Sequence, residues 1–166
     1  FTIGVEEEYL LVDVHTRAVA HDPPPGLFEA LHDRTDGRAF PEFLRSQVEV
    51  ATPVCRTISE VRASLTELRR AVVEESARFG LAPIASASHP FSLSSTQKRT
   101  DKERYVALLE EMQGVARRMM ICGLHVHVGI DDDELRIDLM NQARYFLPHL
   151  LALSCSSPFW EGERTG

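Results

Sequence analysis

The sequence predicts an α+β fold, with a mostly antiparallel sheet and helices packed on one of its faces. Segments whose apolar residues alternate at period two are interspersed with segments whose apolar residues recur every three or four positions, which are the patterns of strands and helices. The first strand-like segment is followed by a turn and a short returning strand, which favours antiparallel pairing. The 166 residues contain no internal repeat, low-complexity tract or linker, so a single domain is the simplest partition.

The composition is typical of a globular domain and argues against several classes of protein. Hydrophobic residues make up 43% of the chain and charged residues 26%, which are ordinary values. The formal net charge of -7 argues against nucleic-acid binding, which usually needs a basic face. The chain has no apolar run of the roughly 18 residues that a membrane span needs. Three widely spaced cysteines without a CxxC motif favour reduced thiols in a cytoplasmic protein.

The first strand, residues 1–12, carries two acidic residues on its polar face. Glu6 and Glu8 project side by side, because alternate residues of a strand point to the same side. Two carboxylates this close repel each other, and the pKa of one of them rises unless a cation lies between them. A solvated acidic strand edge is the alternative interpretation. Glu7 falls on the apolar face, so we expect it to have a partner such as an arginine.

The middle of the chain is predicted to contain a strand, a long helix and a further strand. Residues 43–52 alternate as a strand, with Glu49 on its polar side. Residues 57–79 carry an apolar stripe at helical spacing, begin with a capping box and stop at Gly80. We interpret the charges of this helix as a solvated outer face. Residues 81–87 follow as a strand.

Apart from a strand at residues 119–130, the rest of the chain is predicted to form loops and helices. The polar residues 92–100 form either a plain surface loop or a lid with phosphate-binding cations. A second capping box begins a helix that runs to about residue 118. Two more helices are expected to begin at the cap residue Asp131 and at Pro148. Residues 156–166 are expected to form a loop.

Residues 119–130 form the most informative strand. One face presents His125 and His127 between glycines, which leave room for a ligand to approach. Two neutral imidazoles on one strand face suit a metal ion or a phosphate, although polar residues on the wet face of a sheet are an alternative interpretation. The opposite face is apolar and is expected to enter the core; its residues are Cys122, Leu124, Val126, Val128 and Ile130.

If the strands predicted at residues 1–12, 43–52 and 119–130 share one sheet, their polar faces form one surface. Glu6, Glu8, Glu49 and the two histidines all lie on the polar faces of strands whose other faces are apolar. Three carboxylates brought together without a divalent cation would be costly. Oxygen-rich ligation with one imidazole suits Mg²⁺ or Mn²⁺. The sequence therefore predicts a metal site formed by Glu6, Glu8, Glu49 and one of the two histidines.

Six short motifs lie in order along the chain. They are GVEEEYL at 4–10, QVEVATP at 47–53, HPF at 89–91, RY at 104–105, GLHVHVG at 123–129 and SSPFW at 156–160. Together they resemble the motifs of the glutamate–cysteine ligase type 2 family, whose members are ATP-dependent carboxylate–amine ligases. The resemblance covers the whole chain, and six motifs in order are far more specific than any one of them.

The resemblance implies a glutamine synthetase-like catalytic fold, in which a curved antiparallel sheet forms a funnel over metal ions. It also implies roles for individual residues, carried over motif by motif. The resemblance implies metal binding by Glu6, Glu8, Glu49 and His125, phosphate contacts by His127 and Arg104, and substrate contacts by Thr52 and His89.

Family members are longer than this chain, which begins at Phe1 and ends at Gly166. We therefore expect residues 1–166 to be the N-terminal half of a longer catalytic domain. The resemblance implies ATP and Mg²⁺ as cofactors, with Mn²⁺ as a possible substitute, and a glutamate-like amino acid and a cysteine-like amine as substrates. We expect a homo-oligomer without nucleic-acid or membrane partners.

The implied reaction moves the γ-phosphoryl group of ATP to a carboxylate, and an amine then attacks the acyl phosphate. Such a ligase needs no covalent nucleophile, so none is assigned to the cysteines. Two alternatives remain at this stage: a metal-dependent hydrolase that activates water, and a non-catalytic relative that binds a ligand. ATP-dependent product formation distinguishes the ligase from the hydrolase, and binding of Mg²⁺–ATP without turnover would indicate the non-catalytic relative.

Overall fold

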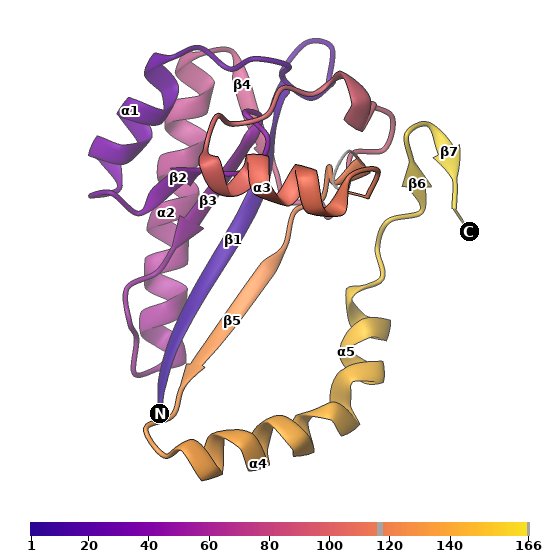
Figure 1. The fold of residues 1–166 in the computed structure, drawn as a ribbon. Helices are drawn as coiled ribbons and strands as arrows, with labels where there is room; N and C mark the ends of the chain where they lie inside the picture. Colours follow the sequence, from indigo (N-terminus) through magenta and orange to yellow (C-terminus); the bar gives the residue numbers. More distant parts are fainter. Residues whose placement is uncertain (116–117, 166) are drawn as a thin grey trace.

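The computed structural model describes residues 1–115 and 118–165, except for the side chains of residues 104, 108 and 109. Its main feature is a five-stranded antiparallel sheet built around the long strand β1 (Thr2–Asp13). This confirms the predicted mixture of helices and antiparallel sheet, and the sheet is open rather than closed (Figure 1). The other strands of the sheet are β2 (Ala39–Pro41), β3 (Gln47–Ala51), β4 (Leu81–Ile84) and β5 (Leu124–Gly129).

Strand β1 organises the sheet because it pairs with neighbours along both of its edges. On one edge β3 pairs with residues 6–10, and β2 lies beyond β3. On the other edge β5 pairs with residues 2–7 and β4 with residues 10–13, so these two strands follow one another along β1. Every pairing is antiparallel.

Two helices, α1 (Gly26–Arg34) and α2 (Ile58–Arg78), cover one face of the sheet. The core between them and the sheet contains Tyr9, Leu11, Leu27, Leu31, Val48, Val50, Leu68 and Val72. Helix α2 begins where the sequence predicts, because the Thr57 side chain accepts a hydrogen bond from the Glu60 amide at 3.2 Å. It ends before Gly80, whose φ of +72° suits a glycine.

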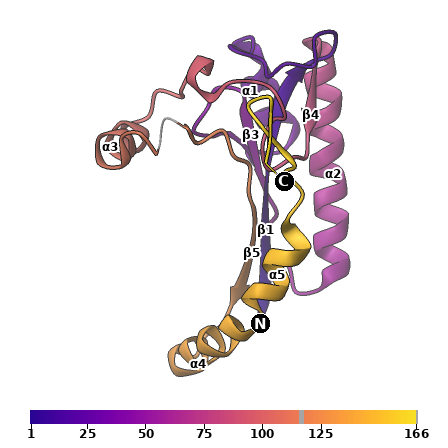
Figure 2. The same cartoon turned by 90° about the vertical axis from the view of Figure 1, so that its right-hand side faces the viewer.

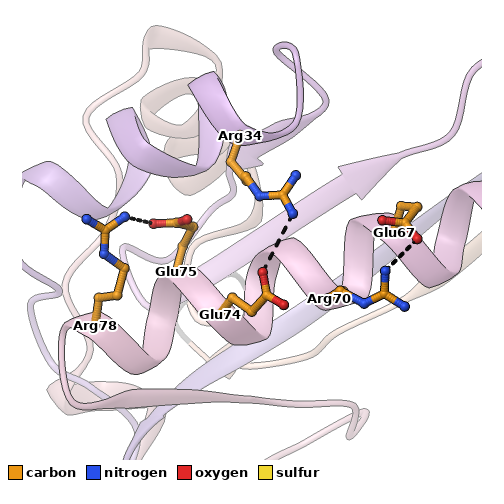
Figure 3. A network of polar contacts seen from close by, with 6 residues as sticks. All are labelled: Arg34, Glu67, Arg70, Glu74, Glu75 and Arg78. Atoms are coloured by element: carbon orange, nitrogen blue, oxygen red, sulfur yellow. Dashed lines mark hydrogen bonds and ion pairs between the residues drawn. The ribbon is translucent and has the colours of Figure 1, made fainter.

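The outer face of α2 carries the ion pairs expected of a solvated helix surface (Figure 3). Its exposed ion pairs are Arg70–Glu67 at 2.7 Å and, with α1, Arg34–Glu74 at 3.6 Å, whereas Arg78 pairs at 2.7 Å with Glu75, which is itself buried. Exposed pairs of this kind contribute about 0–1 kcal/mol each. They confirm the predicted solvated face but explain little of the stability.

Arg69 departs from that prediction, because it turns from α2 toward the sheet. Its guanidinium makes a two-pronged ion pair with the Glu7 carboxylate, with Nε 2.8 Å from Oε2, and the Tyr9 hydroxyl also donates to Glu7. Burial raises the pKa of Glu7, but the hydrogen bonds from Arg69 and Tyr9 outweigh that effect and leave the pKa below its ordinary value. The arginine partner expected for Glu7 is therefore Arg69.

Among the described residues, a helix covers the opposite face of the sheet at one end. There α3 (Glu103–Met112) lies across the sheet from α2, as Figure 2 shows. A second core forms beneath this cover from Leu10, Val12, Phe43, Leu44, Tyr105, Met120 and Cys122. The rest of this face, where the first half of β1 lies beside β5, has no helix over it among the described residues.

Several predicted boundaries are wrong, and local hydrogen bonds explain the main one. The strand predicted over 43–52 is only β3, because residues 43–46 turn back toward β2. The Gln47 side chain accepts the Leu44 amide at 3.0 Å, and the Gln47 amide donates to the Leu44 carbonyl at 2.9 Å. Strand β4 ends at Ile84 rather than at residue 87. The loop 92–100 holds a 3₁₀ turn, η1 (Ser94–Thr96).

The C-terminal part of the chain, from Asp133 onward, forms an arm that leaves the sheet and runs beside it (Figure 1). Its elements are α4 (Asp133–Ala143), η3 (Arg144–Phe146), α5 (Leu147–Ser154), β6 (Phe159–Trp160) and β7 (Glu163–Arg164). The hairpin β6–β7 replaces the loop predicted there. Asp132, not Asp131, caps α4, because its carboxylate accepts the Leu135 amide at 2.8 Å. The helix after Thr100 ends at Met112 rather than near 118; residues 116–117 lie outside the described residues.

None of the helices in the described part of the chain is both long enough and apolar enough to span a bilayer.

Candidate functional site

The strand register brings the predicted acidic residues and histidines onto one face of the sheet. Glu8 lies directly opposite Glu49 on β3, and Glu6 lies directly opposite His125 on β5. His127 follows two residues later, opposite Gly4. Directly opposed residues of antiparallel strands project to the same side, so these five side chains share the face that lies opposite α2. The predicted common face is confirmed.

Glu6 is held between the two histidines. Its Oε2 lies 3.2 Å from His125 Nδ1 and 3.1 Å from His127 Nε2. The hydrogen bond from His127 lowers the pKa of Glu6, burial opposes this, and His125 lowers the pKa further. The sequence predicted that the pKa of one of the paired carboxylates rises unless a cation lies between them. Glu6 escapes this because two imidazoles, rather than the Glu8 carboxylate, are its nearest partners.

Glu8 is held by backbone on the neighbouring strand. The Gly123 amide donates to Glu8 Oε2 at 2.9 Å. A Cβ atom placed on Gly123 would lie 3.5 Å from both Glu8 Oε1 and His125 Nε2, so both side chains reach over this glycine. Sequence reasoning identified the glycine as open space but missed its amide as a donor to Glu8.

The donor set has the chemistry that a hard divalent cation prefers, namely carboxylate oxygens with one imidazole. Within residues 1–115 and 118–165, however, no three histidine, cysteine or acidic side chains lie close enough to hold a metal ion. Glu6 is turned toward the histidines and Glu8 toward Gly123. The Cβ atoms of directly opposed residues are about 5 Å apart, so Glu8 and Glu49, and likewise Glu6 and His125, lie within side-chain reach of each other.

Thr52 lies beside this face, immediately after β3. Its Oγ1 accepts the Val5 amide at 3.0 Å, and its own amide donates to the Val5 carbonyl at 2.9 Å. The hydroxyl and the backbone amide of Thr52 therefore both bind the backbone of Val5, and they hold β1 next to the end of β3. The substrate contact expected of Thr52 stays a prediction.

His89 lies apart from the sheet-face residues and is buried at 2% exposure. Its Nδ1 accepts the amides of Phe91 and Ser92, at 3.3 and 2.9 Å, so Nε2 carries the proton and donates to the Arg17 carbonyl at 2.9 Å. Both ring nitrogens thus fix the 89–92 turn to the loop after β1. This geometry indicates a structural role and gives no support to the predicted substrate contact.

We expect His89 to make the protein sensitive to mild acid. Burial lowers the pKa of His89, and the bond to the Arg17 carbonyl only partly opposes this. The unfolded chain therefore binds a proton as the pH falls through the ordinary value of 6.5, whereas folded His89 resists it, so stability falls below that pH. In His89→Gln this loss should disappear. The measurement is the urea midpoint at about pH 7.5 and about pH 5.5, with the exposed His21→Gln as the control that keeps the wild-type loss.

Three further residues bear on the predicted site. The side chain of Arg104, expected to contact phosphate, lies outside the described residues. Cys122 is buried, as its parity predicted, and burial raises the pKa of its thiol to about 12. It therefore stays protonated, which fits a site without a cysteine nucleophile. Gln47, which sequence reasoning did not select, binds the Ile121 carbonyl at 2.7 Å and so fixes the segment before β5.

Comparison with known proteins identifies relatives along the whole chain. The sequence model of the glutamate-cysteine ligase family 2 matches residues 2–166. A protein of Rhodospirillum rubrum with the provisional name glutamate–cysteine ligase 2 is 55% identical over 170 residues, and a namesake in Paracoccus denitrificans is 54% identical over 165 residues. They cover 100% and 99% of this chain, which spans 44% of the length of each relative.

Solved structures share the fold at low sequence identity. A glutamate–cysteine ligase from Francisella tularensis, in complex with AMP, superposes with a TM-score of 0.62 at 17% identity over 85% of this chain and 29% of its own. A bifunctional glutathione synthetase from Pasteurella multocida gives 0.59 at 18% identity, over 88% of this chain and 19% of its own. These likenesses confirm the fold.

Proposed function

Since the chain belongs to the glutamate-cysteine ligase family 2, we propose that the full-length protein is an ATP-dependent carboxylate–amine ligase. It would join a glutamate-like carboxylate to a cysteine-like amine through an acyl phosphate. The single observation that carries this proposal is the common face of Glu6, Glu8, Glu49 and His125. The AMP named in the Francisella tularensis structure supports a nucleotide site in this fold.

The proposed chemistry assigns binding and orientation to this face. A carboxylate is a poor acyl donor, and phosphorylation by ATP gives it phosphate as a leaving group. Glu6, Glu8, Glu49 and His125 would hold Mg²⁺, or Mn²⁺ in its place; the ion supplies positive charge that offsets the charge of the phosphates. His127 and Arg104 would contact those phosphates, which keeps donor and acceptor in line.

The hydrogen bonds of Glu6 suit a site in which a bound cation replaces the present partners of this carboxylate. Its lowered pKa keeps the carboxylate anionic at neutral pH, so it is ready to bind a cation. The two imidazoles that now bind Glu6 are at least half exposed, and so they can turn to new partners with little loss of packing. One of them, His127, would then be free for a phosphate oxygen.

We expect the full-length protein to transfer oxygen from the carboxylate substrate to phosphate. The assay supplies ATP, Mg²⁺, cysteine and glutamate labelled with ¹⁸O in its γ-carboxylate. An acyl phosphate intermediate predicts ADP as product and one ¹⁸O atom in each inorganic phosphate, since the labelled oxygen leaves with the phosphoryl group.

Other outcomes separate the competing mechanisms. Release of AMP with the label in AMP would indicate an acyl adenylate and overturn the phosphoryl step. Hydrolysis of an amide without any ATP would favour a metal-dependent hydrolase. Tight binding of Mg²⁺–ATP with neither product would identify a non-catalytic relative.

A further inference from the structure

An apolar trough lies between β5 and α5, on the side of the sheet that carries α2. Its cavity has a volume of about 1340 Å³. Glu7, Tyr9 and Arg69 also border it. The leucines and valine that define the trough are Leu124 and Val126 of β5 and Leu147, Leu150, Leu151 and Leu153 of α5.

The walls of the trough are exposed although their sequence pattern is that of a core. Leu124 and Val126 are 62% and 60% exposed, and Leu151 is 65% exposed. The sequence predicted that the apolar face of this strand enters the core. That prediction holds for Cys122 but is wrong for Leu124, Val126 and Val128, because α2 packs over β1 and β4 and does not reach over β5. Exposed apolar side chains gathered on one surface mark sites that bind another protein segment, a ligand or a membrane.

The trough is larger than the roughly 300–1,000 Å³ of ordinary small-molecule pockets, and one of its walls is a free strand edge. Strand β5 pairs with β1, and the Glu8 amide donates to the Gly123 carbonyl. By the alternation of an antiparallel ladder, the amides of Val126 and Val128 point away from β1. Among the described residues no backbone group binds that edge. Unpaired edges of this kind accept a further strand.

We propose that a β-strand from the remaining part of the same polypeptide fills this trough and pairs with β5. The relatives are more than twice as long as this chain, which spans 44% of their length, so they supply further chain to occupy it. A tethered segment binds at a high effective concentration and loses little translational freedom. The docked strand would alternate, with its apolar residues facing the leucines of α5. The proposal does not depend on the ligase activity.

Hydrogen exchange in the full-length protein tests the proposed pairing. The amides of Val126 and Val128 should exchange at least about 100-fold more slowly than in an unstructured chain, because they would be hydrogen-bonded inside a sheet. This protection should be the same at all protein concentrations. Exchange near the unstructured rate would overturn the proposal. Protection that is lost on dilution to the monomer would also overturn it, and would assign the edge to a second copy.

Substitutions provide a second, independent measurement in the full-length protein. Leu151→Asp places a charge in the trough and should lower Tm by more than about 5 °C if the trough is covered. The control is Ile58→Asp, at a residue that is equally exposed at 66% but lies at the start of α2, outside the trough. An equal, small effect of both changes would show that the trough stays open and contradict the docked strand. If Leu151→Asp fails to fold, the exchange measurement on the wild type decides.

Discussion

Replacing Glu8 by glutamine in the full-length protein is expected to lower ligation by at least about 100-fold while leaving Tm almost unchanged. Glutamine keeps the shape of Glu8 and an oxygen that can still accept the Gly123 amide. It removes one negative charge from the face that would hold the cation, and the charge of that cation provides much of the stabilisation of a transferring phosphoryl group. The measurements are ADP release with glutamate and cysteine supplied, Mn²⁺ affinity and Tm.

The control for this change is Glu29→Gln, on the exposed first turn of α1. It makes the same chemical change far from the sheet face and should leave ADP release and Mn²⁺ affinity as in the wild type. If Glu8 were only part of a solvated acidic edge, both variants would behave alike. Wild-type ADP release from Glu8→Gln would therefore remove Glu8 from the proposed site.

Much of the site-bearing sheet could be predicted because strand periodicity is a local property. The alternation in β1 and β5 placed Glu6, Glu8 and His125 on polar faces. Few registers between β1 and β5 keep these faces on the same side of the sheet, because a slip of one residue turns every side chain of a strand to the other face. Helix α2 was predicted almost to the residue because Thr57 and Gly80 mark its ends. In each case the signal lies within a few neighbouring residues.

What could not be predicted depends on contacts between distant segments. The 43–46 turn depends on side-chain bonds of Gln47 to Leu44 and to Ile121, and periodicity does not reveal these. The exposure of Val126 depends on where α2 stops covering the sheet. The pairing of Glu6 with two histidines, instead of repulsion by Glu8, depends on which strand lies beside β1.

Arg69 is another residue whose contacts could not be predicted from its local sequence. Its position in α2 predicted a place on the solvated face, whereas the structure pairs it with Glu7. Arg69→Met is expected to destabilise the full-length protein by about 2 kcal/mol. Loss of one partner from a buried ion pair costs about 3–5 kcal/mol, and the expectation here is lower because the Arg69 side chain is 58% exposed and water can replace part of it. Urea unfolding at neutral pH measures the difference.

The neighbouring Arg70→Met is the matched control, because Arg70 pairs with Glu67 on the exposed face. Its cost should stay below about 0.5 kcal/mol. Adding Glu7→Gln to Arg69→Met should recover part of the lost stability, since the buried charge is then gone. Equal effects of the two arginine variants would show that the Glu7 pair contributes no more than a surface pair.

The pH dependence of the Arg69→Met effect identifies its cause. In the wild type the lowered pKa of Glu7 stabilises the fold above the ordinary value of 4.5, and this contribution is lost as the pH falls through the lower folded value. Without Arg69 the burial of Glu7 dominates and raises its folded pKa above 4.5. The variant is then penalised at neutral pH and regains stability as the acid protonates. The difference between wild type and Arg69→Met should therefore shrink from pH 7 toward about pH 4, whereas a difference that stays constant would indicate lost packing of the Arg69 stem instead of lost charge.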